Sequence, residues 1–181
     1  RVQLVKLASE MHVLLFCLHH IISDMWSGQL MIKELSEAYS ARISGENPPW
    51  EPLRLHYADY AAWQRNWLKG DVLEQQLNYW RKQLGEQHPV LELPTDYPRP
   101  AQQSFKGGQV AFDIPKLLRD KLTTFSRQHG FTVFQVLLCS FQLLLARYSG
   151  QTDIRVGVPI ANRTRSEMEG VLGCFVNTQV L

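Results

Sequence analysis

The chain has 181 residues, of which 45% are hydrophobic and 20% charged, as in a globular domain with a core of its own. The formal net charge of +2 comes from 19 basic and 17 acidic residues. That near balance gives no basic stripe for a nucleic acid and no strong attraction to an acidic membrane surface. No apolar run reaches the ~18 residues of a membrane span, so we expect neither nucleic acid nor a membrane as a partner.

Three cysteines, Cys17, Cys139 and Cys174, each lie within an apolar run. Their odd number and wide spacing argue against a disulfide framework and against a zinc knuckle. We therefore expect buried free thiols in a reducing compartment, which makes the cytoplasm the expected location.

The first elements that the sequence predicts are two strands, at residues 2–7 and 12–18, arranged as a hairpin. The second strand includes the continuous apolar run VLLFCL, typical of a buried strand. Apolar residues then recur at helical spacing over residues 25–43, and Gly45 is placed to end that helix.

Between this strand and this helix lie two histidines and an aspartate, His19, His20 and Asp24. Adjacent side chains at a strand end point to opposite faces, so one imidazole is expected to face a cleft and the other to be buried and bonded to the backbone. Asp24 or Ser23 is expected to cap the helix. Three interpretations fit these residues: a structural core pair with a capping carboxylate, a metal site, or general acid/base chemistry. Metal ligation is the least favoured, because opposed imidazoles chelate poorly and no cysteine pair lies nearby.

The middle of the chain predicts two helices followed by a linker. Tyr57, Tyr60, Trp63 and Trp67 share one face of the first helix, which we expect to pack in the core, with Asp59 off that face and free to form a salt bridge. The second helix is expected over residues 72–85. Residues 88–108 hold four prolines and little periodicity, as in a linker between lobes.

The last part of the chain alternates strands and helices. Residues 109–114 predict a half-buried strand, and a helix is expected from Pro115 to Gly130. Thr132 and Gln135 have the spacing of a capping box, before a helix over 133–148 that is apolar almost all round and should be central to its lobe. A strand at 154–158, a polar loop at 159–172 and a strand at 173–181 follow. This alternation predicts an α/β sandwich architecture.

Several stretches resemble the condensation domains of nonribosomal peptide synthetases. HHIISDMWS (19–27) is similar to the family motif HHxxxDG, YADYAAW (57–63) to its Tyr-x-Asp-Phe-Ala-x-Trp motif, and GCFVNTQVL (173–181) to its Gly-x-Phe-Val-Asn-Thr motif. DYPRP (96–100) and RYSGQTDIRVGVPIANR (147–163) also read like family segments. The motifs occur in the family's order and cover nearly the whole chain.

The resemblance implies the chloramphenicol-acetyltransferase-like fold, in which two sandwich lobes form a V. Residues 1–95 would be the C-terminal part of the first lobe and residues 96–181 the beginning of the second. The family's domain is more than twice as long as this chain, which starts without Met in a strand-like run. We therefore expect an internal fragment.

The resemblance also implies a function in secondary metabolite biosynthesis: amide-bond formation between an acyl or peptidyl thioester and an aminoacyl thioester. Both substrates ride on phosphopantetheine arms of upstream and downstream carrier domains, next to an adenylation domain, and no cofactor is bound directly. His20 would act as base or position the amine. His19 and Asp24 would support the loop, Asp24 through an arginine expected upstream of Arg1. Asn177 and Ser27 are the expected substrate contacts.

One departure from the motif is Met25, which stands where the family has glycine. If that position needs a positive φ or close backbone approach, a side chain there adds strain or narrows the site. This feature favours an alternative, a catalytically impaired domain that only binds carriers. A second alternative is an epimerisation-type relative, which shares the two histidines, although residues 175–178 are more like a condensation domain.

Overall fold

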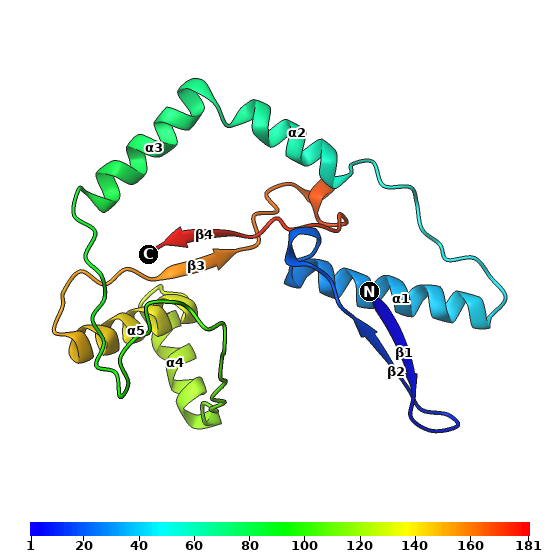
Figure 1. The fold of residues 1–181 in the computed structure, drawn as a ribbon, viewed down its shortest axis with the longest axis horizontal. Helices are drawn as coiled ribbons and strands as arrows, with labels where there is room; N and C mark the ends of the chain where they lie inside the picture. The colour runs from blue at the N-terminus through cyan, green and yellow to red at the C-terminus, as the bar shows by residue number, and fades with distance from the viewer. The chain divides into compact units, whose positions relative to one another are not determined.

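The computed structural model describes all 181 residues, and Figure 1 shows its elements in chain order. They are β1 (Val2–Lys6), β2 (His12–Phe16), η1 (His20–Ile22), α1 (Met25–Ile43), α2 (Tyr57–Trp67), α3 (Gly70–Leu84), α4 (Lys116–Gln128), α5 (Val133–Ser149), β3 (Gly157–Ile160), η2 (Ser166–Met168) and β4 (Asn177–Val180). The chain forms two compact units. The first combines residues 1–85 with 157–179, and the second combines residues 86–156 with 180–181.

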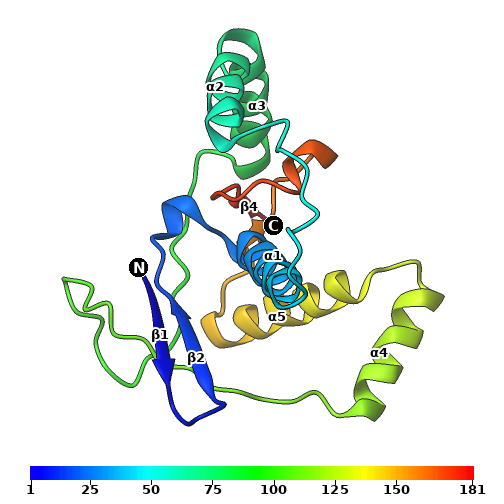
Figure 2. The same ribbon diagram turned by 90° about the vertical axis from the view of Figure 1, so that its right-hand side faces the viewer.

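The first unit begins with the predicted hairpin. β1 and β2 pair antiparallel, with Val2 opposite Phe16 and Lys6 opposite His12. Figure 2 shows β2 leading through the turn η1 into α1. The helix α1 has the predicted bounds, because Asp24 caps its first turn and Gly45 follows it at a φ of 74°, a conformation that glycine adopts without a Cβ penalty.

The aromatic face of α2 is only partly buried. Tyr60 is buried, whereas Trp63 and Trp67 stack on each other with ring centroids 5.4 Å apart and stay exposed. The predicted core position therefore holds for the start of the face and is wrong for its end. Asp59 forms no salt bridge. Its carboxylate instead accepts a hydrogen bond from the His56 backbone N–H at 2.9 Å and caps the helix.

A small core joins α2 to a segment far along the chain. Its buried hydrophobic residues are Tyr60, Met168, Val171 and Phe175, with Leu55 and Tyr57 packed against them. The Phe175 ring lies 4.6 Å from the Tyr60 ring, centroid to centroid. Residues 159–172, predicted as a polar loop, thus supply two core side chains. The strands β3 and β4 pair with each other. β3 begins three residues later than the strand predicted at 154–158, and β4 is shorter than the strand predicted at 173–181.

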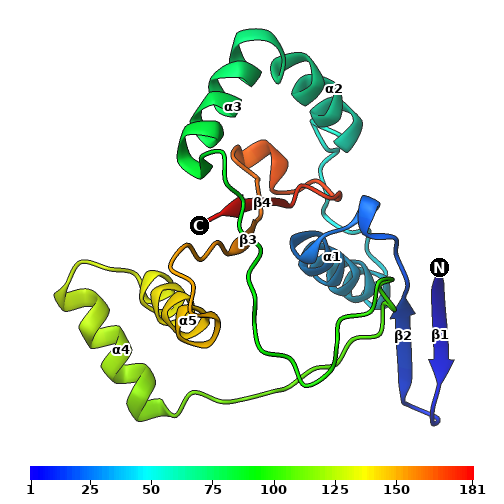
Figure 3. The same cartoon turned by 60° about the vertical axis from the view of Figure 1, so that its left-hand side comes forward.

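The second unit contains the helices α4 and α5, which Figure 3 shows joined by a short turn. The predicted capping box is present: the Thr132 hydroxyl accepts from the Gln135 N–H, and the Gln135 side chain accepts from the Thr132 N–H. No residue of α5 is buried, contrary to the central position predicted for it. No single helix has the length and apolar character of a membrane span, whereas α4 and α5 together pass that test as a pair bent by 107°.

The predicted linker, residues 88–108, contains no helix or strand. Its start is held by Gln151, whose side chain accepts from the Glu92 N–H at 2.8 Å and donates to the Val90 carbonyl at 3.0 Å. The strand predicted at 109–114 is absent, and Val110 and Phe112 are 89% and 83% exposed. Alternation alone does not make a strand, because the backbone groups need a neighbouring strand as partner.

The prediction of buried thiols is wrong. Cys17 and Cys139 are exposed, Cys174 is half-buried, and all three are free. Apolar neighbours in the sequence were a poor guide to burial here, since the apolar runs around Cys17 and Cys139 are themselves largely exposed.

Candidate active site

The two histidines lie where β2 gives way to the turn η1, and the turn separates their roles. The Nδ1 atom of His19 accepts a hydrogen bond from the Ile21 backbone N–H at 3.1 Å. His19 is therefore bonded to the backbone as predicted, but it is exposed rather than buried. This bond stabilises the turn that carries His20.

The His20 ring is exposed and lies beside an open space. Its Nδ1 atom is 3.5 Å from the Sγ atom of Cys174, which leaves Nε2 as the nitrogen available to a ligand. A pocket of about 400 Å³ adjoins the ring. Its lining comes from the end of β2, the turn and the first half of α1: Phe16, Leu18, His20, Ser23, Asp24, Gly28, Met31 and Ile32.

Asp24 is the most heavily bonded side chain of the motif. One carboxylate oxygen accepts from the Ser27 backbone N–H at 2.8 Å, and the other accepts from the Phe175 N–H at 3.1 Å. The Nη2 atom of Arg163 lies 3.3 and 3.4 Å from the two oxygens. The side chains of this ion pair are 1% and 2% exposed. The arginine expected upstream of Arg1 is therefore Arg163, which lies 139 residues after Asp24.

Arg163 connects the helix start to the segment before β4. Its Nη1 atom donates to the carbonyls of Met168 and Val171. The guanidinium carbon lies 4.1 Å from the centre of the Phe175 ring and 5.6 Å from that of Trp26, within the range of a cation–π interaction. Its Nε atom is buried without a partner. Such a buried charge is tolerated because the carboxylate, two carbonyls and two rings surround it.

The electrostatic balance at Asp24 favours the ionised form. Burial raises the pKa of the carboxyl group, but hydrogen bonds from Ser27, the Phe175 N–H and the charge of Arg163 together outweigh burial, so the pKa falls below its ordinary value of 3.8. Asp24 stays a carboxylate at neutral pH. It therefore acts as an acceptor that holds the loop, not as a proton donor.

Ser27 and Asn177, the two predicted substrate contacts, have different surroundings. The Ser27 hydroxyl is fully buried. It donates to the Gly173 carbonyl at 2.9 Å and accepts from the Gly173 N–H and from Arg163. All of its hydrogen-bonding positions are filled, so a substrate-binding role for Ser27 has no support in this geometry. Asn177 is exposed at the start of β4, and its side-chain oxygen accepts from the Thr178 N–H at 2.8 Å.

Tyr57 fixes the backbone next to His20. Its hydroxyl donates to the Cys174 carbonyl at 2.8 Å, and burial raises the pKa of the phenol, with smaller contributions from Cys174 and Asp24, so the donor keeps its proton. The ring packs directly over Gly173. A Cβ atom at position 173 would lie 2.6 Å from the ring carbon Cε2 and 2.9 Å from Cγ. Only glycine fits there while the ring stays in place.

Met25 does not strain the backbone. It is the first residue of α1 and does not have a positive φ, which among residues other than glycine occurs at Phe105 and Asn162. Its side chain is 85% exposed. It lines a pocket of about 260 Å³ together with Asp24, Trp26, Gln29, Pro159, Ile160, Ala161 and Val176. The effect of replacing the motif's glycine is therefore on the space in this pocket, not on the conformation of the chain.

Sequence reasoning missed three contributors to this site: Arg163, Cys174 and the packing of Tyr57 on Gly173. Arg163 lies within the family-like segment 147–163, but no role was predicted for it. The available signal was Asn162, because asparagine tolerates a left-handed backbone conformation. It adopts this conformation at a φ of 54°, in a turn directly before Arg163.

Comparison with known proteins identifies the family. The family model described as "Condensation domain" matches residues 1–181. The chain is 51% identical over 178 residues to a linear gramicidin synthase of Brevibacillus parabrevis, covering 98% of this chain and 2% of that protein. It is 45% identical over 181 residues to malpinin synthetase of Mortierella alpina, covering 100% of this chain and 2% of that protein.

Solved structures agree in fold. The crystal structure of the X-domain from teicoplanin biosynthesis matches with a TM-score of 0.89 at 28% identity, over 100% of this chain and 41% of that one. A four-domain nonribosomal peptide synthetase bound to AMP and glycine matches with a TM-score of 0.85 at 26% identity, over 100% of this chain and 13% of that one. The chain thus spans a small part of the curated relatives and less than half of these structures. It belongs to the condensation-domain family of nonribosomal peptide synthetases and has its chloramphenicol-acetyltransferase-like α/β fold.

Proposed function

We propose that this chain is part of a condensation domain that joins an acyl or peptidyl thioester to an aminoacyl thioester through an amide bond. The observation that carries the proposal is the exposed His20 imidazole beside a pocket of about 400 Å³. The loop that presents it is anchored by the buried pair of Asp24 and Arg163. A fixed base next to open space is the arrangement that proton transfer requires.

The reaction assigned to His20 is removal of a proton from the attacking amine. The amine nitrogen bonds to the thioester carbon, and the carbonyl takes up negative charge as the adduct forms. The proton moves from nitrogen to Nε2 of His20. When the adduct collapses, the carbon–sulfur bond breaks, the amide forms, and the proton neutralises the departing thiolate of the donor carrier. His19 and Asp24 support this step by holding the loop and do not touch the reacting atoms.

The partners proposed for the parent enzyme are an upstream and a downstream carrier domain and a neighbouring adenylation domain. The carriers supply the phosphopantetheine arms, so the condensation domain binds no cofactor of its own. Three free cysteines support a reducing, cytoplasmic setting. Asn177 is kept as a proposed substrate contact. The assignment of residues 1–95 and 96–181 to a first and a second lobe also stays a prediction.

The proposal is tested by His20→Ala in the full-length domain with loaded donor and acceptor carriers, following the dipeptidyl thioester by mass spectrometry. Loss of a general base lowers the rate by about 10²–10⁴-fold. His12→Ala serves as the matched control, since this exposed histidine of β2 has no side-chain partner near the site. A loss well below a hundredfold would assign His20 to positioning the amine, and an unchanged rate would remove it from the reaction.

One observation favours a second function, a domain that binds carriers without catalysis: the exposed Met25 side chain lies in the pocket next to Asp24. In that case Met25→Gly restores product formation that the natural sequence lacks, while carrier binding is the same in both. If the natural sequence and Met25→Gly both form product, the catalytic proposal stands. Inverted stereochemistry at Cα of the loaded aminoacyl carrier would instead identify an epimerisation domain.

A further inference from the structure

The contact between Cys174 and His20 goes beyond the motif, because it joins the proposed base to a thiol 154 residues away in the chain. The Sγ atom lies 3.5 Å from Nδ1 of the ring. Cys174 is the half-buried cysteine of the three. No other side chain makes a hydrogen bond to the His20 ring in this structure.

The position of Cys174 is fixed by its backbone on both sides. The carbonyl of Cys174 accepts from the Tyr57 hydroxyl at 2.8 Å, and the next N–H, that of Phe175, donates to Asp24 at 3.1 Å. On the other side, the N–H and carbonyl of Gly173 both bond to the buried Ser27 hydroxyl. Four hydrogen bonds therefore hold residues 173–175 against the start of α1. The thiol is presented to the imidazole by a rigid support and not by a free loop.

The chemistry of the ring decides what this contact does. For Nε2 to accept a proton from an amine, the neutral ring must carry its hydrogen on Nδ1. The contact with Cys174 has two possible forms: with the hydrogen on Nδ1 the sulfur accepts it, and with the hydrogen on Nε2 the thiol donates to Nδ1. The first form is the one that the reaction requires. The carboxylate of Asp24 is not available for this role, because its oxygens are already bonded to Ser27, Phe175 and Arg163.

We propose that Cys174 is a positioning residue for the condensation reaction: its sulfur holds the His20 ring with Nδ1 protonated and Nε2 free toward the pocket. The proposal rests on the proposed function of His20. It adds a specific role for the second residue of the GCFVNT stretch, which the sequence motif leaves unassigned.

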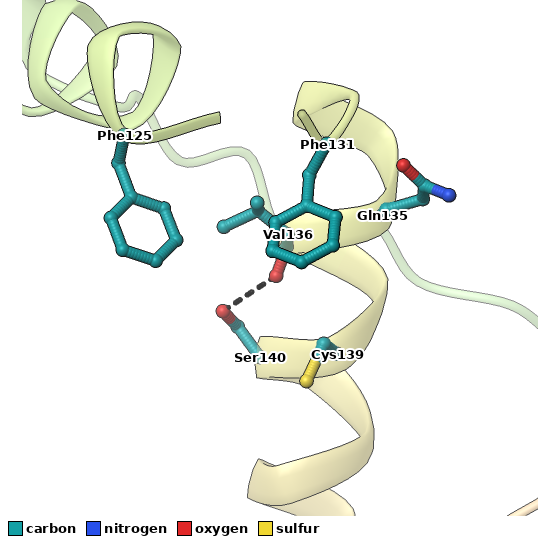
Figure 4. A pocket seen from close by; sticks show the side chains of 6 residues that line it. All are labelled: Phe125, Phe131, Gln135, Val136, Cys139 and Ser140. Atoms are coloured by element: carbon teal, nitrogen blue, oxygen red, sulfur yellow. Dashed lines mark hydrogen bonds between the residues drawn. The ribbon is translucent and has the colours of Figure 1, made fainter. Parts of the chain in front are cut away.

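The test compares Cys174→Ala, which removes the acceptor, with Cys174→Ser, which keeps an acceptor atom (Oγ) on the same Cβ. Both are made in the full-length domain within its synthetase. We expect Cys174→Ala to lower kcat by about two- to tenfold, the range for one neutral hydrogen bond, with KM for the acceptor carrier unchanged, and Cys174→Ser to restore most of the rate. Cys139→Ala is the matched control. Cys139 lies on α5 in a pocket with two phenylalanines and no histidine (Figure 4), and its loss should leave the rate unchanged.

A second measurement determines which nitrogen of the His20 ring carries the hydrogen. Nitrogen-15 NMR of histidine-labelled domain distinguishes protonated Nδ1 from protonated Nε2. We expect the His20 signal to report Nδ1–H in the natural sequence and in Cys174→Ser, and a shift toward Nε2–H in Cys174→Ala.

The two arms separate this inference from the proposed function. If His20→Ala lowers the rate while Cys174→Ala changes neither kcat nor the tautomer, the inference is wrong and the proposed function stands. If Cys174→Ala and Cys174→Ser lose the same activity with an unchanged tautomer, the side chain only packs and the inference is again wrong. If His20→Ala keeps full activity, His20 takes no part in the reaction, and both its proposed role and the positioning role of Cys174 are wrong.

Discussion

The buried ion pair of Arg163 and Asp24 joins two segments that are far apart in the sequence. Asp24 belongs to the loop before α1, and Arg163 belongs to the segment between β3 and β4, yet their side chains are almost completely enclosed. Truncating one partner leaves the other charge buried and alone. That is far more destabilising than losing an exposed pair such as Lys33 and Glu37.

We therefore expect Arg163→Met to lower the free energy of unfolding of the full-length domain by about 3–5 kcal/mol, measured by urea titration. Arg119→Met is the matched control. Arg119 lies on the exposed surface of α4, where a substitution changes stability by about 0.5 kcal/mol or less. Equal effects of the two substitutions would contradict a structural role for the buried pair.

The lowered pKa of Asp24 predicts a dependence of stability on pH. A carboxyl group with a lower pKa in the folded state than in the unfolded state contributes stability that is fully present above the unfolded value, here 3.8. That contribution is lost as the pH falls through the lower, folded value. We expect an acid-induced loss of structure near the site below about pH 4. The fluorescence of Trp26 can monitor this loss, because its indole N–H is bonded to the Glu169 carbonyl.

In Asp24→Asn this acid-dependent contribution should be absent, and the variant should be less stable than the natural sequence at neutral pH. A stability profile of Asp24→Asn parallel to that of the natural sequence between about pH 3 and 5 would assign the acid sensitivity to other carboxylates, since this interval brackets the ordinary aspartate value.

At the scale of elements, the site depends on the contact between α2 and the segment that precedes β4. Tyr57 at the start of α2 covers Gly173 and bonds to Cys174, while Tyr60 packs on Phe175. The aromatic motif and the Gly-x-Phe-Val-Asn-Thr motif are far apart in the sequence and meet here. The packing of these two motifs on each other determines where Cys174 and Phe175 lie relative to the loop that carries His20.

Gly173→Ala tests this contact. The added methyl group must displace the Tyr57 ring, and we expect a loss of about 1–3 kcal/mol in stability, the usual range for overpacking. A lower condensation rate should accompany it as residues 174 and 175 shift. Gly107→Ala is the control, because a Cβ at position 107 meets no atom within 4 Å. A fully stable and active Gly173→Ala would show that the ring moves aside freely.

At the scale of the whole molecule, the 181 residues leave much apolar surface uncovered. Among its large hydrophobic side chains, Phe105, Val110 and Phe112 are 87%, 89% and 83% exposed. Four hydrophobic residues are buried. Exposure on this scale destabilises a chain in water and promotes association.

We expect the 181-residue chain by itself to bind a hydrophobic dye such as ANS, to unfold without a sharp transition and to form no condensation product. The full-length domain should show little dye binding and a cooperative transition. Cooperative unfolding and turnover by the 181-residue chain would contradict the prediction. The same dye titration of the full-length domain is the control, because it contains the same 181 residues.

Local sequence signals were enough to predict most helices and to recognise the family. Helix α1 was predicted at about residues 25–43, close to its observed bounds, since its start and end depend on Asp24 and Gly45, which act within one turn. The hairpin and the capping box of α5 follow from equally local signals. The motifs were enough to identify the condensation-domain family, because their order and spacing reflect a shared fold.

The residues that complete the site could be found only from the folded chain. The pairing of Asp24 with Arg163, the closed hydrogen bonding of Ser27 and the contact of Cys174 with His20 all join residues more than 130 positions apart. The strand predicted at 109–114 failed for a related reason, since a strand exists only beside a partner. Side-chain periodicity predicts the secondary structure of a short segment. Contacts between residues far apart in the sequence depend instead on how distant segments pack against each other. That packing is a property of the whole unit.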